Sequence, residues 1–323
     1  MKAAYVEQLG SEDNFIYGDL PDPEMGPRQV LVRVKAAAIN RGDLFRREGS
    51  YGGLAPSFPF TPGWEIAGVI EAIGSDVTDR QVGQRVVATL AQGGYADLVA
   101  VHRAGILPIP EGLSFEDAAS IPMVFLTSWY ALVKVARLEE GEAALIQSGG
   151  SGVGVAAIQI AKHVGARVIT TAGTAEKIAK CRELGADEAV NYTEQDFLPE
   201  AMRFTSDRGI SVVLESVGGE VLEKSIDALA PLGRLVTVGN SSRSPIGPDM
   251  NKLSAKNVSF CSLSLARQMG FGGVMPELAK ILELCSQGKM HAVIDRVFPL
   301  AETAEAQRYV AQRKNFGKVL LVP

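Results

Sequence analysis

The sequence has few cysteines and no long apolar run. Its 323 residues include three cysteines, Cys181, Cys261 and Cys285, whose wide spacing excludes both a disulfide framework and a C-x-x-C metal site. We expect each to be a buried small side chain in a protein of a reducing compartment. The N-terminal "MKAAYVEQLG" lacks the apolar core of a signal peptide, and no segment approaches the ~20 apolar residues of a membrane helix. These absences predict a cytoplasmic protein with no membrane partner.

Positive charge is not in excess either. The formal net charge is -5, which argues against a nucleic-acid partner because nucleic acid requires a basic face. The hydrophobic share of 46% and the charged share of 21% are typical of a soluble globular protein. A chain of this length is expected to form two domains.

The pattern of the chain changes twice. The first third, including "QVLVRVKAAAI" (29–39), has short strands with frequent turn signals, which favours a small barrel or sandwich. Near Pro122 one helix is predicted to end and another to begin. From Glu142 onward strands alternate with helices, which predicts a parallel sheet. The tail, with "VIDRVFPL" and "GKVLLVP", is β-like again. We predict a catalytic domain at 1–121 completed by 288–323, and a nucleotide-binding domain at 122–287.

A strand, a glycine-rich turn and a helix start follow one another in "ALIQSGGSGVGVAA" (144–157). The pattern G-x-G-x-x-G maps onto Gly149, Ser151 and Gly154, with Ser151 in place of the middle glycine. In a dinucleotide site this turn is tight and bare, so that backbone N–H groups approach a pyrophosphate at the positive end of the helix. Methyltransferases also use such turns. The predicted cofactor-binding residues here are Gly149, Ser151, Gly152 and Val153.

The end of the second strand distinguishes between dinucleotides. An NAD site usually has Asp or Glu there to bind the ribose 2′-OH, whereas "VITTAGTAEK" has Thr171 and Ala172 and no acid. Gly173 and Thr174 offer small polar groups, and Lys177, one helical turn later, can reach a 2′-phosphate. The sequence therefore favours NADPH. The missing acid and the β-rich flanks make a methyltransferase a remote alternative.

Seven segments in order carry a resemblance to a known family. They are "AAAINRGDLFRREGSY", "PFTPGWEIAGVIEAIG", "GGYADLVAV", "AASIPMVFLTSWYAL", "SGGSGVGVAAIQIAKHVGARVITTAGTAEK", "LGADEAVNY" and "GKVLLVP". Over essentially its whole length the chain resembles the medium-chain dehydrogenase/reductase superfamily, specifically its zinc-independent quinone oxidoreductase branch. The resemblance implies an α/β fold: a GroES-like β-rich catalytic domain plus a Rossmann NADP-binding domain. It also implies a cofactor in the cleft and usually a homodimer.

Zinc-dependent relatives carry a cysteine after the strand that here ends at Ile39 and a histidine in a Gly-His-Glu turn. This chain has Asn40 and Arg41 at the first place and Trp64 at the second. A catalytic Zn²⁺ needs about three protein ligands, so we predict no metal site. We expect Trp64 to fill or line the vacated site. For the adjacent Glu65 we expect a structural role, as a hydrogen-bond acceptor or as the partner of a Lys or Arg.

Without a strong Lewis acid, the chemistry that remains is hydride transfer to an electron-poor acceptor, a quinone or an α,β-unsaturated carbonyl. By resemblance, Asn40 and Thr127 face the nicotinamide, and the Tyr51 phenol stabilises enolate charge on the acceptor. We interpret Asp43 as a helix N-terminal charge and leave it outside the site. The resemblance assigns the remaining cofactor contacts to Tyr192, Ser216, Val217, Gly239, Asn240, Ser241, Leu263, Leu265, Asn315 and Lys318.

Two alternatives remain open at the level of sequence. One is an enoyl-thioester reductase on the same fold, which needs a groove for a pantetheine arm. The other is a protein that binds NADPH for a structural or regulatory purpose and does not catalyse a reaction.

Overall fold

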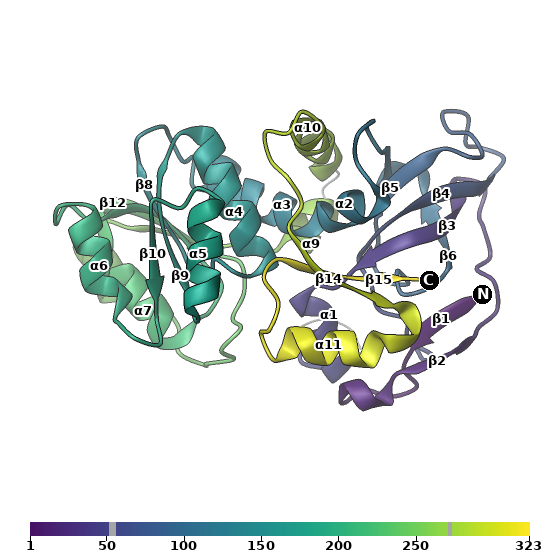
Figure 1. Cartoon of the computed structure of the whole chain (residues 1–323), viewed down its shortest axis with the longest axis horizontal. Helices are drawn as coiled ribbons and strands as arrows, with labels where there is room; N and C mark the ends of the chain where they lie inside the picture. The colour runs from purple at the N-terminus through teal and green to yellow at the C-terminus, as the bar shows by residue number, and fades with distance from the viewer. Residues whose placement is uncertain (52–55, 271–272) are drawn as a thin grey trace. The chain divides into compact units, whose positions relative to one another are not determined.

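The computed structural model describes residues 1–51, 56–270 and 273–323. It divides into two compact units (Figure 1). The first unit combines Met1–Met123 with Val274–Pro323, and the second comprises Val124–Gly273. The tail therefore returns to the first unit, as the sequence predicts. Helix α10 (Val274–Ser286) belongs to this first unit, whereas the sequence prediction assigns it to the nucleotide-binding domain.

The first unit is built on a seven-stranded sheet. Its strand order is β14-β15-β3-β4-β5-β7, and β6 also pairs with β3. All of these pairs are antiparallel except β14 with β15. The strands of the unit are β1 (Lys2–Tyr5), β2 (Ile16–Asp19), β3 (Gln29–Ala38), β4 (Glu65–Ile73), β5 (Arg85–Thr89), β6 (Leu98–His102), β7 (Ile106–Pro108), β14 (Ile294–Pro299) and β15 (Lys318–Val322).

Strand β3 shows how the sequence pattern becomes structure. Val30, Val32 and Val34 are buried while Lys35 is exposed, so the first part alternates across the sheet. The following Ala36–Ala38 segment is buried throughout, so both faces of the sheet are covered at this end, where β15 and β4 pair with β3. The strand thus ends deep in the unit, immediately before Asn40. Helices of the unit are α1 (Arg41–Glu48), α2 (Phe115–Ser120), α10 and α11 (Thr303–Ala311), with 3₁₀ turns η1 (Glu12–Asn14), η2 (Arg103–Gly105) and η4 (Leu300–Glu302).

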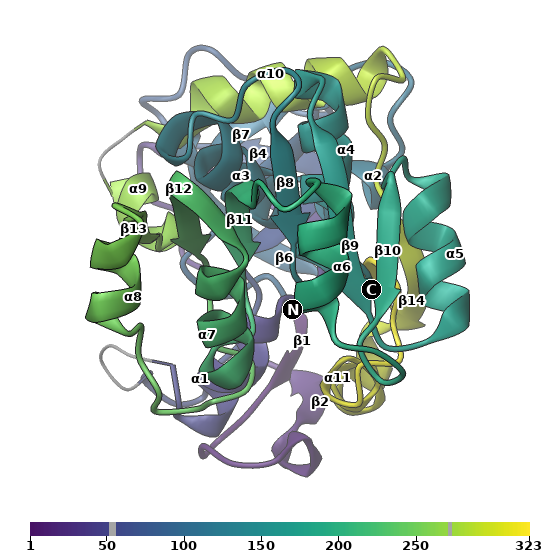
Figure 2. The ribbon, with the colours of Figure 1, turned by 90° about the vertical axis from the view of Figure 1, so that its left-hand side faces the viewer.

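The second unit is built on a six-stranded sheet in which every pair is parallel. Its order is β10-β9-β8-β11-β12-β13, which Figure 2 shows as strands side by side. The order reverses at β8, so this is the doubly wound arrangement predicted from the alternation of strands and helices. The strands are β8 (Ala143–Ile146), β9 (Arg167–Ala172), β10 (Glu188–Asn191), β11 (Ile210–Glu215), β12 (Leu229–Thr237) and β13 (Ser259–Ser262).

Helices cover both faces of this parallel sheet. Right-handed crossovers place helices that lead in one direction along the sheet on one face and those that lead back on the other. In Figure 1, α4 and α5 accordingly lie on one side of the strands and α6 and α7 on the opposite side. The helices are α4 (Gly152–Val164), α5 (Ala175–Glu183), α6 (Phe197–Phe204), α7 (Gly219–Asp227), α8 (Met250–Ala255) and α9 (Leu265–Gly270).

Several helix boundaries agree with the sequence analysis. Helix α2 ends at Ser120, and Pro122 is the first residue of α3 (Pro122–Trp129), where its missing N–H removes no helical bond. Helix α3 continues into a π-helical turn, η3 (Tyr130–Val135). Gly165 ends α4 in the left-handed region, with φ of 90°. The sequence analysis predicts no helix in the C-terminal tail, whereas the structure has α11 there. Within the described residues, no helix is long and apolar enough to span a bilayer.

Candidate active site

The glycine-rich turn of the second unit is as tight as the sequence predicts. It follows β8, and Gly149 N–H donates to the Thr171 carbonyl of β9 over 2.8 Å. A Cβ on Gly149 would overlap the Thr170 hydroxyl, and one on Gly154 would overlap the Ser148 carbonyl. A side chain at either position would therefore push the turn away from β9 or from α4. The backbone here is bare because the packing leaves no room for Cβ atoms.

Ser151 is the N-cap of α4. Its Oγ accepts a hydrogen bond from Gly154 N–H at 3.0 Å. The hydroxyl proton can still be donated to a phosphate oxygen. The N–H groups of Gly152 and Val153 lie in the first turn of a 13-residue helix, where an N–H has no helical acceptor. The four predicted residues of this turn thus come together at a helix N-terminus, a favourable environment for an anion.

Buried side chains that the sequence analysis does not single out hold the turn in place. The Gln147 amide donates to Ser225 Oγ at 3.0 Å and accepts from Thr171 Oγ1 at 2.7 Å. Thr171 Oγ1 in turn accepts from Ser148 N–H at 3.2 Å. Ser148 has a positive φ of 59°, unfavourable for a residue other than glycine, and this network lies directly against it. The sequence signal for this network is the presence of two polar residues, Gln147 and Thr171, at the ends of neighbouring apolar strands.

The residues predicted for the adenosine phosphate lie at the end of β9. Thr174 Oγ1 caps α5 by accepting from Lys177 N–H at 3.2 Å. A Cβ on Gly173 would lie 2.6 Å from the hydroxyl of Tyr192, whose side chain is 49% exposed. Gly173, Thr174 and Tyr192 are therefore neighbours, and Lys177 lies in the first turn of α5. No carboxylate follows β9 directly in the chain.

The loops after β11 and β12 also lie side by side. Ser241 N–H donates to the Ser216 carbonyl at 3.1 Å. A Cβ on Gly218 would overlap the Asn240 amide oxygen, so Gly218, with φ of 81°, lets the two loops approach closely. The structure thus brings together five predicted residues: Ser216, Val217, Gly239, Asn240 and Ser241.

Glu215, the last residue of β11, organises the first of these loops. It is buried, and its Oε1 accepts from Val217 N–H at 2.6 Å and Gly218 N–H at 2.8 Å. Burial raises the pKa of this carboxyl, and the backbone donors act against the rise. The sequence analysis does not identify Glu215. The sequence signal for Glu215 is an acid at the end of a largely apolar strand. A carboxylate buried there needs hydrogen-bond donors, which the following loop supplies.

The first unit holds a buried polar cluster where β3, β4 and β15 meet. The Lys318 ammonium donates to the Ile39 carbonyl at 2.8 Å, to Asn40 Oδ1 at 2.9 Å and to Glu65 Oε1 at 2.8 Å. Asn40 Nδ2 donates to the same Glu65 oxygen at 2.8 Å. Glu65 is fully buried, as expected of a structural acceptor paired with a lysine. The resemblance predicts that Lys318 contacts the cofactor, whereas the structure engages its three N–H donors inside this unit.

Asp43 lies in the first turn of α1, as the sequence analysis interprets it, and it is completely buried. Its Oδ2 accepts from Asn40 N–H at 2.8 Å and from the Tyr95 hydroxyl at 3.0 Å. Its Oδ1 accepts from Gly63 N–H at 3.3 Å. Burial raises the pKa of Asp43 from 3.8 to about 6, although these donors act in the opposite direction. Asp43 therefore fixes the backbone of Asn40 and joins α1 to the turn before β4.

Trp64 packs between α1 and Tyr51. The rings of Trp64 and Tyr51 are tilted by 59°, with centroids 5.2 Å apart. Gly42 has no room for a Cβ because the indole lies against it. Burial raises the pKa of the Tyr51 phenol, and the Asp43 carboxylate adds to this rise. Tyr51 thus keeps its proton at neutral pH and can act as a donor. Among the described residues, no three His, Cys, Asp or Glu side chains are grouped as metal ligands.

The remaining predicted residues are placed but their roles stay predictions. Thr127 lies in α3, in the second unit, whereas Asn40 and Tyr51 belong to the first. Leu263 and Leu265 are buried beyond the end of β13, and Leu263 N–H donates to the Thr237 carbonyl at 2.9 Å. Asn315 Nδ2 donates to the Gly317 carbonyl at 2.7 Å, which shapes the turn before β15.

Comparison with known proteins agrees with both halves of this description. Residues 26–111 match the alcohol dehydrogenase GroES-like domain, and residues 152–287 match a family described as zinc-binding dehydrogenase. The chain is 34% identical over 321 residues to quinone oxidoreductase of Pseudomonas aeruginosa, with 97% of each protein covered. This protein belongs to the medium-chain dehydrogenase/reductase superfamily, in its quinone oxidoreductase branch.

Other relatives in the superfamily extend the comparison. The chain is 31% identical over 329 residues to 2-haloacrylate reductase of a Burkholderia species, covering 99% of this chain and 98% of that protein. The crystal structure of Escherichia coli quinone oxidoreductase complexed with NADPH superposes with a TM-score of 0.94, 28% identity and full coverage of both chains. That of CurK enoyl reductase superposes with a TM-score of 0.90 and 30% identity, over 99% of this chain and 98% of that one.

The raised pKa of Asp43 predicts a pH-dependent contribution to stability. Between about pH 4 and pH 6 the native carboxyl holds its proton while the unfolded one releases it. Its contribution to the free energy of unfolding is therefore complete below pH 4 and falls as the pH rises to about 6, by at most about 3 kcal/mol. Chemical denaturation of wild type and of Asp43→Asn between pH 4 and pH 7 measures this. The difference in free energy of unfolding between the two proteins removes the contribution of the other carboxyl groups. A difference that does not change with pH would contradict the raised pKa of Asp43.

Proposed function

We propose that this protein is an NADPH-dependent oxidoreductase that transfers a hydride to quinones or other α,β-unsaturated carbonyls. The observation that carries the proposal is which residues lie at the end of β9, beside the glycine-rich turn. There, Gly173 and Thr174 follow the strand at the place where an NAD site usually has an acid, and the exposed Tyr192 is their neighbour. The relatives that act as quinone oxidoreductase and 2-haloacrylate reductase support this choice of reaction.

Different residues of the chain bind the cofactor and contact the acceptor. NADPH, when bound, supplies the hydride. The N-terminus of α4 and the bare turn hold its pyrophosphate, and Lys177 with Tyr192 holds its 2′-phosphate. The Tyr51 hydroxyl, protonated at neutral pH, donates to the carbonyl oxygen of the acceptor. With Trp64 in place of a zinc-ligating histidine, an acceptor that is already electron-poor is the one expected to react.

A second candidate function is enoyl-thioester reduction. The specific observation in its favour is the similarity to CurK enoyl reductase, at a TM-score of 0.90. Both reactions need the same cofactor and differ in the acceptor. The predicted cytoplasmic location bears on neither and stays a prediction.

Turnover of a panel of acceptors tests the function. We expect the protein to oxidise NADPH with at least one quinone or enone, and to do so faster than it oxidises NADH. Absorbance at the nicotinamide band follows the reaction. Fast turnover of a crotonyl thioester with slow quinone reduction would favour the second candidate. NADPH binding in a titration, without turnover of any acceptor, would instead indicate a regulatory protein.

Substitution of Lys177 tests the cofactor assignment. Lys177→Ala removes a charged partner of the 2′-phosphate, worth ~1.5–3 kcal/mol, so the KM for NADPH should rise about 10- to 100-fold. The KM for NADH should change by less than about twofold. Lys180→Ala is the matched control, since it removes a lysine of the same helix that is paired with Glu176 at 2.7 Å. Equal effects of Lys177→Ala on both cofactors would remove Lys177 from the phosphate site.

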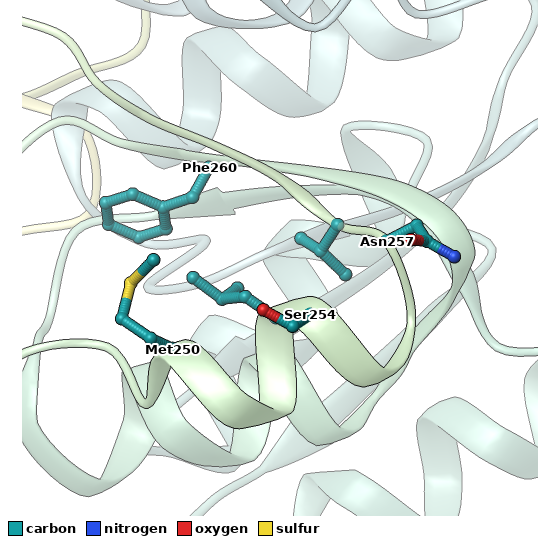
Figure 3. Close-up of a pocket in the computed structure, with 6 residues that line it drawn as sticks. Met250, Ser254, Asn257 and Phe260 are labelled. Carbon is teal, nitrogen blue, oxygen red and sulfur yellow. The ribbon is translucent and has the colours of Figure 1, made fainter.

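We also propose a homodimer, in which β13 pairs with its copy. Strand β13 ends the sheet order of the second unit, so one of its sides has backbone groups that a second strand can pair with. A pocket of about 350 Å³ beside it is largely apolar (Figure 3). Met250 at its rim is 66% exposed. The residues lining this pocket are Met250, Leu253, Ser254, Asn257, Val258 and Phe260.

Sedimentation analysis tests the dimer. Wild type should sediment as a dimer, and Met250→Glu should weaken self-association at least tenfold because it places a charge at the proposed contact. Val82→Glu is the control, an equivalent change at a valine of the first unit that is 60% exposed. A monomeric wild type at micromolar concentration would contradict the proposal.

A further inference from the structure

Asn40, one of the predicted catalytic residues, lies between two charged side chains that come from opposite sides of its strand. In the sheet, β15 and β4 are the two neighbours of β3 at this end. The antiparallel register that pairs Leu320 with Ala38 brings Lys318 level with Asn40. The register between β3 and β4 brings Glu65, the first residue of β4, beside the same strand end. The sheet itself therefore delivers one cation and one anion to the Asn40 side chain.

We propose that Lys318 and Glu65 are positioning residues that fix the orientation of the Asn40 carboxamide for the reaction. The inference rests on the proposed function and on the prediction from the resemblance that Asn40 faces the nicotinamide. Asn40 Oδ1 accepts from the ammonium at 2.9 Å, and Asn40 Nδ2 donates to the carboxylate at 2.8 Å. Rotating the amide by 180° would turn its NH₂ group toward the ammonium and its oxygen toward the carboxylate. Both contacts would become repulsive, so one orientation is enforced.

The two charges have no freedom to reorganise. The Lys318 side chain is 3% exposed and that of Glu65 is 0% exposed, and their N···O distance is 2.8 Å. Lys318 satisfies its three donors with Ile39, Asn40 and Glu65. The second oxygen of Glu65 accepts from Met123 N–H at 2.7 Å. Each group that touches Asn40 is thus itself held by a second bond.

Stability alone does not account for this arrangement. A buried ion pair carries a large desolvation cost and is often no more stabilising than apolar side chains of the same volume. What an apolar pair cannot do is distinguish the oxygen from the nitrogen of a carboxamide. The orientation of Asn40 is therefore the property that depends on the charges. It also gives Lys318 a role that requires no contact with the cofactor.

The double variant Glu65→Gln/Lys318→Met tests the proposal without leaving an unpaired buried charge. If the oxygen of the introduced glutamine accepts from Met123 N–H, its NH₂ group faces Asn40 and favours the reversed amide. We expect kcat to fall about tenfold or more, as in Asn40→Ala, while the Kd for NADPH measured by fluorescence changes less than about twofold. The triple variant with Asn40→Ala should be no slower than Asn40→Ala alone, because the pair acts through that residue.

Lys2→Met is the matched control, since it breaks an exposed Lys–Asp pair of 2.7 Å in the same unit. It should leave kcat and Kd unchanged. Losses that multiply in the triple variant would overturn the proposal, as would a Kd for NADPH that rises tenfold or more in the double variant. The second result would return Lys318 to the cofactor-binding residues.

A readout independent of turnover separates this proposal from the proposed function. In protein labelled with ¹⁵N-asparagine, the Asn40 carboxamide signal, assigned by its loss in Asn40→Ala, should exchange slowly with solvent in wild type. It should shift and exchange faster in the double variant. Fast exchange in wild type would overturn the positioning role even if the enzyme is active. A slow signal in a protein that reduces no acceptor would retain the orientation and refute only the function.

Discussion

The buried ion pair between Lys318 and Glu65 is the interaction on which the polar cluster of the first unit depends. Its members are 253 residues apart in the chain, so it exists only because the last strand, β15, returns to lie beside β3. Once both charges are buried against the strand end, each needs polar partners, and Asn40 supplies one to each. Asp43 fixes the Asn40 backbone from the other side. The position of one small amide is thus determined by three separate elements of the sheet and one helix.

In the second unit, backbone groups of the glycine-rich turn are held in a fixed orientation. Its predicted pyrophosphate site is made of backbone N–H groups at the start of α4. What it requires is the absence of Cβ atoms at Gly149 and Gly154 and a firm support beneath the turn. The buried Gln147–Thr171 pair gives that support across two adjacent strands. In the first unit, two buried charges orient the Asn40 side chain. In the second unit, buried polar side chains hold the glycine-rich turn and so orient its backbone N–H groups.

Trp64 connects the family resemblance with the local packing. The indole occupies the space against Gly42 and stacks at an angle on Tyr51, so a position that displays a metal ligand in zinc-dependent relatives here holds an aromatic contact. Indole nitrogen is not a zinc ligand, and Glu65 next to it is committed to Lys318 and Met123. The same packing supports Tyr51, the residue proposed to face the acceptor.

The sequence by itself determined the elements whose cues are local. The glycine-rich turn, the helix break at Pro122 and the parallel sheet all follow from residues close in the chain, and the structure confirms them. Ordered motifs also identified the family. Only the tertiary structure decided the partners of buried polar groups: Lys318 with Glu65, Gln147 with Thr171 and Ser225, and Glu215 with its own loop. Such partners depend on strand order and register, which bring together residues that no local spacing relates.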